Sequence, residues 1–166
     1  MHARRALLLA CALAALAAPA ARAADGPGAG LATPAEQRWL LAAERLLINV
    51  ADAGRSSSVT GGSVERARAL LANPQDLFGS AVVYAVFSDC SQSLKNAGRP
   101  TSRLRAIRES IDAACRPLVR ASDLFLRAVH GKQPTALIAA EAQAVAGAKQ
   151  MERAAARLTA FRKTHK

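Results

Sequence analysis

Residues 101–130 contain the pattern that most constrains the fold of this chain. Apolar side chains recur there every three or four residues and stay on one face of a helix drawn at about 100° per residue. The members of this stripe are Leu104, Ile107, Ile111, Ala114, Cys115, Leu118, Ala121, Phe125 and Val129. Because the stripe keeps its phase through Pro117, we expect one long helix kinked at that proline rather than two independent helices.

Four further segments have helical spacing and are separated by proline, glycine or asparagine. Thr33-Pro34-Ala35-Glu36 is a capping box, and the helix that it begins is expected to end near Gly54. A short helix over 63–71, a third one starting at Asn73-Pro74 and a last one from Pro134 to Arg162 follow. The expected inward residues of the third helix are Val82, Val83, Val86, Phe87, Cys90 and Leu94. The expected seam of the last one is Leu137, Ala144, Ala148, Met151, Ala155 and Leu158.

These segments predict an all-α fold. Val82 and Val83 also favour a strand, but no longer alternating pattern competes with the helical ones. Short connections favour antiparallel neighbours, so we expect a four-helix-bundle-like domain over 33–166 with one extra short helix. The chain is 51% hydrophobic, which is too apolar for a disordered protein.

The first 23 residues have the organisation of a secretory signal peptide. Arg4 and Arg5 precede an apolar stretch that is too short to cross a bilayer, and Ala21-Arg22-Ala23 offers a cleavage point. A lipoprotein-type cut before Cys11 is the alternative, although it leaves few apolar residues ahead of the cut. Residues 24–32, rich in glycine, are expected to form a flexible lead-in. We therefore expect a periplasmic or secreted protein.

Two cysteines, Cys90 and Cys115, remain after removal of the signal peptide. An oxidising compartment favours a disulfide between them. In a straight hairpin of the third and fourth helices, the two cysteines would differ in height by about 12 Å. A bridge requires α-carbons within about 7 Å. We therefore expect the third helix to end early, near Ser91, and residues 92–102 to form a loop that runs along the bundle axis to the next helix.

The sequence lacks a constellation typical of catalysis or metal binding. Only two histidines, His130 and His165, follow the signal peptide, and neither belongs to a haem-attachment or zinc motif. We expect His130 to cap a helix and His165 to lie in a solvated tail. These observations predict a non-enzymatic protein without a cofactor or metal. The alternative is a small-ligand or haem carrier with a cavity between helices, lined by His130, Trp39 or Tyr84.

Positive charge is the strongest compositional signal. Three arginines lie in residues 1–23, so their removal lowers the formal charge from +11 to +8. Four-residue spacing suggests that Arg105–Glu109, Arg108–Asp112, Asp112–Arg116 and Asp123–Arg127 neutralise one another on the fourth helix. The uncompensated candidates for contact with an anionic surface are Lys95, Arg99, Arg103, Arg157, Arg162, Lys163 and Lys166. No stacking aromatics accompany them, which disfavours specific nucleic-acid binding.

Two apolar residues of the first helix, Leu41 and Ile48, lie opposite its Trp39 stripe. They are candidates for contact with a partner protein or a second copy. The alternative, which we favour, is that residues 55–72 fold back over the first helix and cover these two residues with Val59, Leu70 and Leu71. Taken together, the sequence predicts an exported helical binding or protein-interaction module with a basic surface.

Overall fold

The structure, a computed structural model, describes residues 30–165. Its α-helices are α1 (Pro34–Arg55), α2 (Val64–Ala72), α3 (Pro74–Ser88), α4 (Cys90–Ser93), α5 (Arg105–Gly131) and α6 (Pro134–Thr164). Two 3-10 turns, η1 (Lys95–Ala97) and η2 (Ser102–Leu104), connect α4 to α5. Residues 30–165 contain no strand, so the predicted all-α fold is confirmed. The expected signal peptide, residues 24–29 of the expected lead-in and Lys166 lie outside the described residues.

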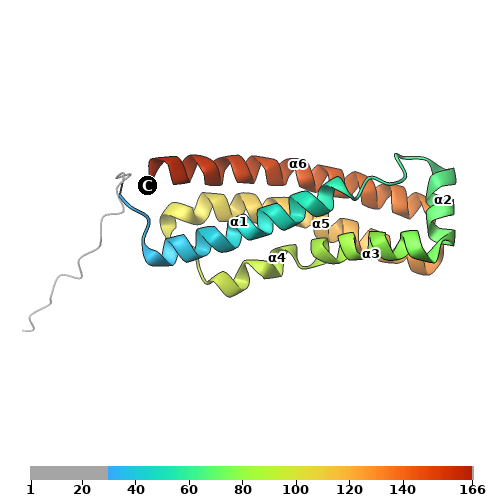
Figure 1. Cartoon of the computed structure of the whole chain (residues 1–166), viewed down its shortest axis with the longest axis horizontal. Helices are drawn as coiled ribbons and strands as arrows, with labels where there is room; N and C mark the ends of the chain where they lie inside the picture. The colour runs from blue at the N-terminus through green and yellow to red at the C-terminus, as the bar shows by residue number, and fades with distance from the viewer. Residues whose placement is uncertain (1–29, 166) are drawn as a thin grey trace, which may run out of the picture.

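The four long helices form an antiparallel bundle. α6 packs against both α5 and α1, and α3 packs against the other side of the same two helices. Successive long helices alternate in direction along the long axis, and α2 crosses one end of the bundle between α1 and α3 (Figure 1). The predicted bundle with an extra short helix is therefore confirmed, with α4 as a further single turn.

The capping box positions the start of α1 as expected. The backbone N–H of Glu36 donates to the Thr33 hydroxyl oxygen at 3.2 Å, and the Thr33 N–H donates to the Glu36 carboxylate at 2.9 Å. The hydroxyl of Thr101 also donates to this buried carboxylate, at 2.7 Å, and Arg103 lies 3.7 Å from it. Burial alone would raise the pKa of Glu36, but these hydrogen bonds and the Arg103 charge outweigh it and lower the pKa below its usual value.

A break after α3 allows the disulfide to form. α3 ends at Ser88, three residues before the expected end, and Asp89 separates it from α4. Cys90, the first residue of α4, bonds to Cys115 with α-carbons 5.5 Å apart. Both cysteines are fully buried. The predicted disulfide and the early end of the third helix are confirmed, although 92–102 contains the end of α4 and the turn η1 and reaches the start of η2 rather than forming a plain loop.

The inward face of α3 differs from the prediction. Val82 is 53% exposed, whereas Tyr84 and Phe87 are buried and Tyr84 stacks on Phe125 of α5 at 4.3 Å. Phe87, Cys90 and Leu94 of the predicted inward set are buried as expected, and Val83 and Val86 are half-buried. In this orientation of α3, Tyr84 and Phe87 bury a large apolar area in the core, whereas Phe78 stays exposed.

The α5–α6 pair makes the most extensive helix contact among the described residues. α5 runs through Pro117 as one helix, as predicted. A Cβ added to Gly147 of α6 would lie 2.5 Å from Cγ of Leu118 on α5. The buried apolar residues of α6, with Gly147, are Leu137, Ala140, Ala144, Gly147, Met151, Ala154 and Leu158. Ala148 and Ala155, predicted for this seam, are half-buried because they lie on the side that meets α1.

Candidate functional site

A groove of about 890 Å³ runs along the surface between α5 and α6. Both helices contribute small apolar residues and longer polar side chains to its lining. The lining residues are Ala113, Arg116, Pro117, Val119, Arg120, Asp123, Leu124, Arg127, Gln143, Ala146 and Gln150. The lining therefore combines apolar and polar side chains.

Three arginines give the groove its positive charge. Arg116, Arg120 and Arg127 are exposed on α5, and within residues 30–165 none of them has an acidic group within 4.0 Å. At 1.5 Å per residue, their positions span about 16 Å along the helix axis. Asp123 is the one acidic residue of the lining. The groove is thus a row of unpaired guanidinium groups.

This result corrects the expectation that the charges of α5 neutralise one another. Of the four pairs predicted, the described part of the chain forms only Arg108–Asp112, at 2.7 Å. Asp112 is therefore already paired with Arg108, on the side away from Arg116. Exposed ion pairs add little to stability because water solvates both charges. The remaining arginines therefore stay exposed to solvent.

The groove also offers neutral hydrogen-bonding groups. Pro117 has no N–H, so the carbonyl of Ala113 lacks its donor in the helical ladder. Gln143 and Gln150 add side-chain amides from α6. Guanidinium groups bind carboxylates and phosphates through paired N–H donors. The lining contains no histidine, cysteine, serine or tyrosine.

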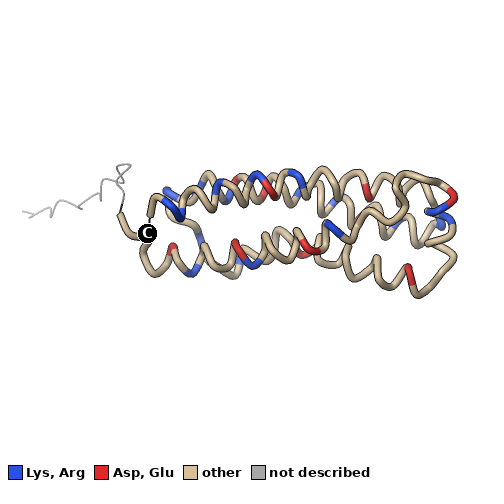
Figure 2. Tube along the Cα trace, turned by 45° about the horizontal axis from the view of Figure 1, so that its top comes forward, with Lys and Arg blue, Asp and Glu red and all other residues tan. Residues whose placement is uncertain are grey.

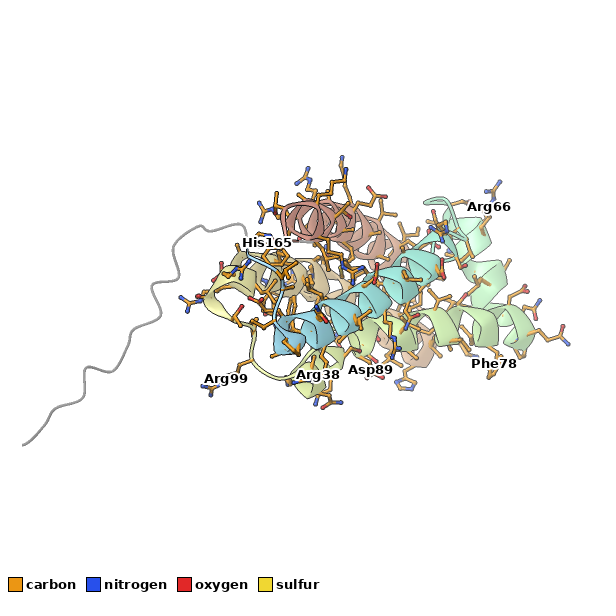
Figure 3. The ribbon with its side chains drawn as sticks, turned by 60° about the vertical axis from the view of Figure 1, so that its left-hand side comes forward. Arg38, Arg66, Phe78, Asp89, Arg99 and His165 are labelled. Carbon is orange, nitrogen blue, oxygen red and sulfur yellow. A yellow bond between two sulfur atoms is a disulfide. The ribbon has the colours of Figure 1, made fainter. Side chains whose placement is uncertain are left out.

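The seven cations predicted to contact an anionic surface do not form one free cluster. Lys95, Arg99 and Lys163 are exposed, and no acidic group within residues 30–165 lies within 4.0 Å of them. Arg99 extends away from the chain at the same end of the bundle as His165 (Figure 3). Lys166 lies outside the described residues. Basic positions outnumber acidic ones on the upper helices near this end (Figure 2).

The other three predicted cations are held by contacts within the chain. Arg162 pairs with Glu44 of α1 through two contacts of 3.0 Å. Arg103 donates to the Gly30 carbonyl at 3.1 Å and lies over the Phe161 ring. The Arg157 guanidinium donates to the Ser110 hydroxyl across the α5–α6 pair. These three side chains therefore connect elements of the bundle and are less available to a partner than the groove arginines.

Leu41 and Ile48 remain on the surface, with exposed fractions of 50% and 55%. The expectation that 55–72 covers them is wrong, because α2 packs on α6 and α3 instead.

Glu141 of α6 holds the segment that connects α1 to α2. Its buried carboxylate accepts the N–H groups of Val59 and Thr60, at 3.1 and 2.7 Å, and the Thr60 hydroxyl at 2.6 Å. Local sequence patterns do not indicate this contact, because the two segments are about eighty residues apart. A glutamate within an alanine-rich helical seam was the available signal.

The residues of the proposed ligand cavity lie in different environments. Trp39 and Tyr84 are buried in the core, and His130 is exposed at the end of α5. Burial, with a smaller effect of the Glu141 charge, raises the pKa of Tyr84 above its usual value. The Trp39 indole nitrogen and the Tyr84 hydroxyl have no hydrogen-bond partner among the described residues. His165, expected in a solvated tail, stacks on Phe161 at 4.1 Å.

Within residues 30–165, no helix combines the length and the apolar character needed to cross a bilayer. In the same residues, no three His, Cys, Asp or Glu side chains come together as a metal site. The chain matches no protein-family model, and comparisons with curated proteins and with solved structures found no similar protein.

Proposed function

We propose that this protein is an exported, non-enzymatic binding module that contacts an anionic partner through the α5–α6 groove. The observation that carries the proposal is the row of Arg116, Arg120 and Arg127, which are exposed and lack acidic partners in the described chain. Lys95, Arg99 and Lys163 extend the positive surface toward one end of the bundle. Coulomb attraction to this surface steers acidic proteins or anionic envelope surfaces toward the groove.

The shape of the groove favours an acidic protein segment over a flat lipid surface. A segment can enter the hollow, place carboxylates on the arginines and donate an N–H to the Ala113 carbonyl. A lipid surface reaches only the outer guanidinium groups. Leu41 and Ile48 are proposed as a second contact, for another protein chain, and do not belong to this groove.

The test uses the chain from Ala24 to Lys166 and two probes. The first is a fluorescent peptide rich in glutamate, and the second is a vesicle that contains anionic lipid. We expect the peptide to bind at low ionic strength and to be released by salt, because exposed charge pairs are screened over about 10 Å at 0.1 M salt. A variant in which Arg116, Arg120 and Arg127 are changed to Gln is expected to lose most of this binding.

The matched control removes the same charge elsewhere. Changing Arg38, Arg66 and Arg68 to Gln takes three exposed cations from α1 and α2, outside the lining of the groove. Equal losses in the two variants would mean that net charge, rather than the groove, determines binding. Vesicle binding without peptide binding would assign the groove to a lipid surface. A Soret band in the purified chain would instead support the alternative function of a haem carrier.

Export is tested separately by cell fractionation. We propose that the chain is periplasmic or secreted and begins at Ala24 after cleavage. Amino-terminal sequencing of the envelope fraction would show this start. A cytoplasmic chain that retains residues 1–23 would contradict the proposal.

A further inference from the structure

The side chains that line the α5–α6 groove recur at seven-residue intervals along both helices. On α5, the lining positions related in this way are 113, 120 and 127, then 116 and 123, then 117 and 124. On α6, Gln143 and Gln150 have the same spacing. Seven residues are nearly two turns of helix, or about 10.5 Å. Both sides of the groove therefore present equivalent positions at a common interval along the bundle axis, where α5 and α6 lie side by side (Figure 1).

From this interval and the unpaired arginines, we infer that the partner enters the groove as an α-helix that carries acidic residues on one face. The inference rests on the proposed function and specifies the kind of acidic segment that binds. A helix that lies along two others repeats its own contacts at seven-residue intervals, as in helical bundles and coiled coils. An amphipathic helix in a groove is also a common mode of peptide recognition.

The spacing of the three arginines matches a helix better than an extended chain. Arg116, Arg120 and Arg127 lie within about 40° of one another around α5, at heights of about 0, 6 and 16.5 Å along its axis. A helix parallel to α5 reaches the same heights with acidic residues at i, i+4 and i+11, which share one face. A strand places side chains of one face about 6.6 Å apart, so its nearest carboxylate would miss the third height by about 3 Å.

Apolar side chains near the arginines provide contact area for the body of such a helix. Ala113, Pro117, Val119 and Leu124 of the lining are half-buried, whereas the three arginines are exposed. Ala146 adds a small exposed side chain from α6. Helix axes approach most closely where the side chains between them are small. A partner helix with alanine beside its acidic residues therefore contacts the apolar lining while its carboxylates reach the guanidinium groups.

Asp123 makes the groove selective for the pattern of charges as well as for their sign. Its side chain is exposed, and among the described residues no cation lies within 4.0 Å of it. Asp123 lies on α5 between Arg120 and Arg127, so it faces one position of the partner within the acidic row. An acidic residue at that position would be repelled, whereas a neutral or basic one would be accepted.

The first experiment compares three alanine-rich peptides of about 18 residues that carry equal charge. The first has glutamates at i, i+4, i+7 and i+11, a pattern that reads the same from either end and so serves for either direction of the helix. The second contains the same residues in an order that distributes the glutamates around the helix. The third keeps the first order but has proline in place of a central alanine, which breaks the helix.

Binding to the chain from Ala24 to Lys166 is measured by fluorescence anisotropy at low ionic strength. We expect the first peptide to bind about tenfold more tightly than the other two, because only a helix with its acidic residues on one face pairs with all three arginines at once. Equal affinities of the three peptides would overturn the inference and leave the groove as the binding site. If the variant with Gln at 116, 120 and 127 binds them as tightly as wild type, the proposed function fails, and this inference with it.

The second experiment tests the register through Asp123. One glutamate of the first peptide faces Asp123 in either direction, so Asp123→Asn is expected to tighten its binding by about twofold. The control is Asp89→Asn, which removes the same charge at the end of α3, outside the lining (Figure 3). Equal affinities of the two variants would overturn the register. Far-UV circular dichroism and Tm of both variants confirm that they fold.

Discussion

Gly147 determines how closely α5 and α6 approach, and its replacement by alanine is the most direct test of that contact. A Cβ at this position would lie 2.5 Å from Cγ and 2.6 Å from Cδ2 of Leu118, and 3.3 Å from the Ala114 carbonyl oxygen. Leu118 is fully buried, so its side chain has no open space to move into. We therefore expect the two helices to separate by roughly 1 Å to restore ordinary contact distances.

The expected free-energy change is the difference between two opposing effects. Alanine has a higher helix propensity than glycine and stabilises a helix interior by about 1 kcal/mol. Overpacking of a core lowers the free energy of unfolding by about 1–3 kcal/mol. The contacts of 2.5 and 2.6 Å with Leu118 place Gly147→Ala at the upper end of that range. Gly147→Ala should therefore lower the free energy of unfolding by about 2 kcal/mol, which corresponds to about 6 °C in Tm for a domain of this size.

Gly79→Ala in α3 is the matched control. Its added Cβ would meet nothing within 4 Å, so only the propensity gain remains. We expect this variant to be more stable than wild type by about 1 kcal/mol. Denaturant unfolding monitored by circular dichroism measures both changes. If Gly147→Ala proves as stable as Gly79→Ala, the close approach of α5 and α6 at Leu118 is wrong.

Three further changes test other parts of the bundle. Replacing Cys90 and Cys115 by Ala removes a crosslink over 25 residues, which should cost about 3.5 kcal/mol in denaturant unfolding; a loss below about 1 kcal/mol would contradict its role. Because hydrogen bonds and Arg103 lower the pKa of Glu36 in the folded protein, the stability from its charge is present above the usual glutamate range and is lost as pH falls. The stability difference between wild type and Glu36→Gln should therefore shrink from about pH 6 to pH 3, and a difference independent of pH would refute the effect. Lys132 adopts the left-handed conformation, with φ of 50°. Lys132→Gly should thus raise the unfolding free energy by about 1 kcal/mol, and an unchanged Tm would argue against strain there.

The sequence predicted the helices and most of their ends because these depend on neighbours within a few residues. The capping box at Thr33, the break at Asn73-Pro74 and the start at Pro134 all act locally, and each helix begins where they indicate. Gly54 illustrates the limit of this reasoning. It was the expected end of α1, but the helix continues to Arg55, and Gly54 provides a close approach to Ala148 of α6.

The candidate site was less predictable than the fold. Spacing along α5 suggested paired charges, but spacing shows only which groups are within reach and not which pairs form in water. Asp112 pairs with Arg108, so Arg116 is left without an acidic partner in the described chain. The groove also requires α6, whose Gln143 and Gln150 complete it. Neither the unpaired arginines nor the groove could be derived from one helix alone.

The sequence by itself determined that this chain forms amphipathic helices with a disulfide between Cys90 and Cys115, because apolar periodicity and capping are properties of local segments. Only the tertiary structure decided how α3 rotates about its axis, where Glu141 holds the 55–63 segment and which cations stay unpaired. These outcomes depend on contacts between residues far apart in the chain. The helices alone permit several arrangements, and small differences in buried area and hydrogen bonding determine which of them forms.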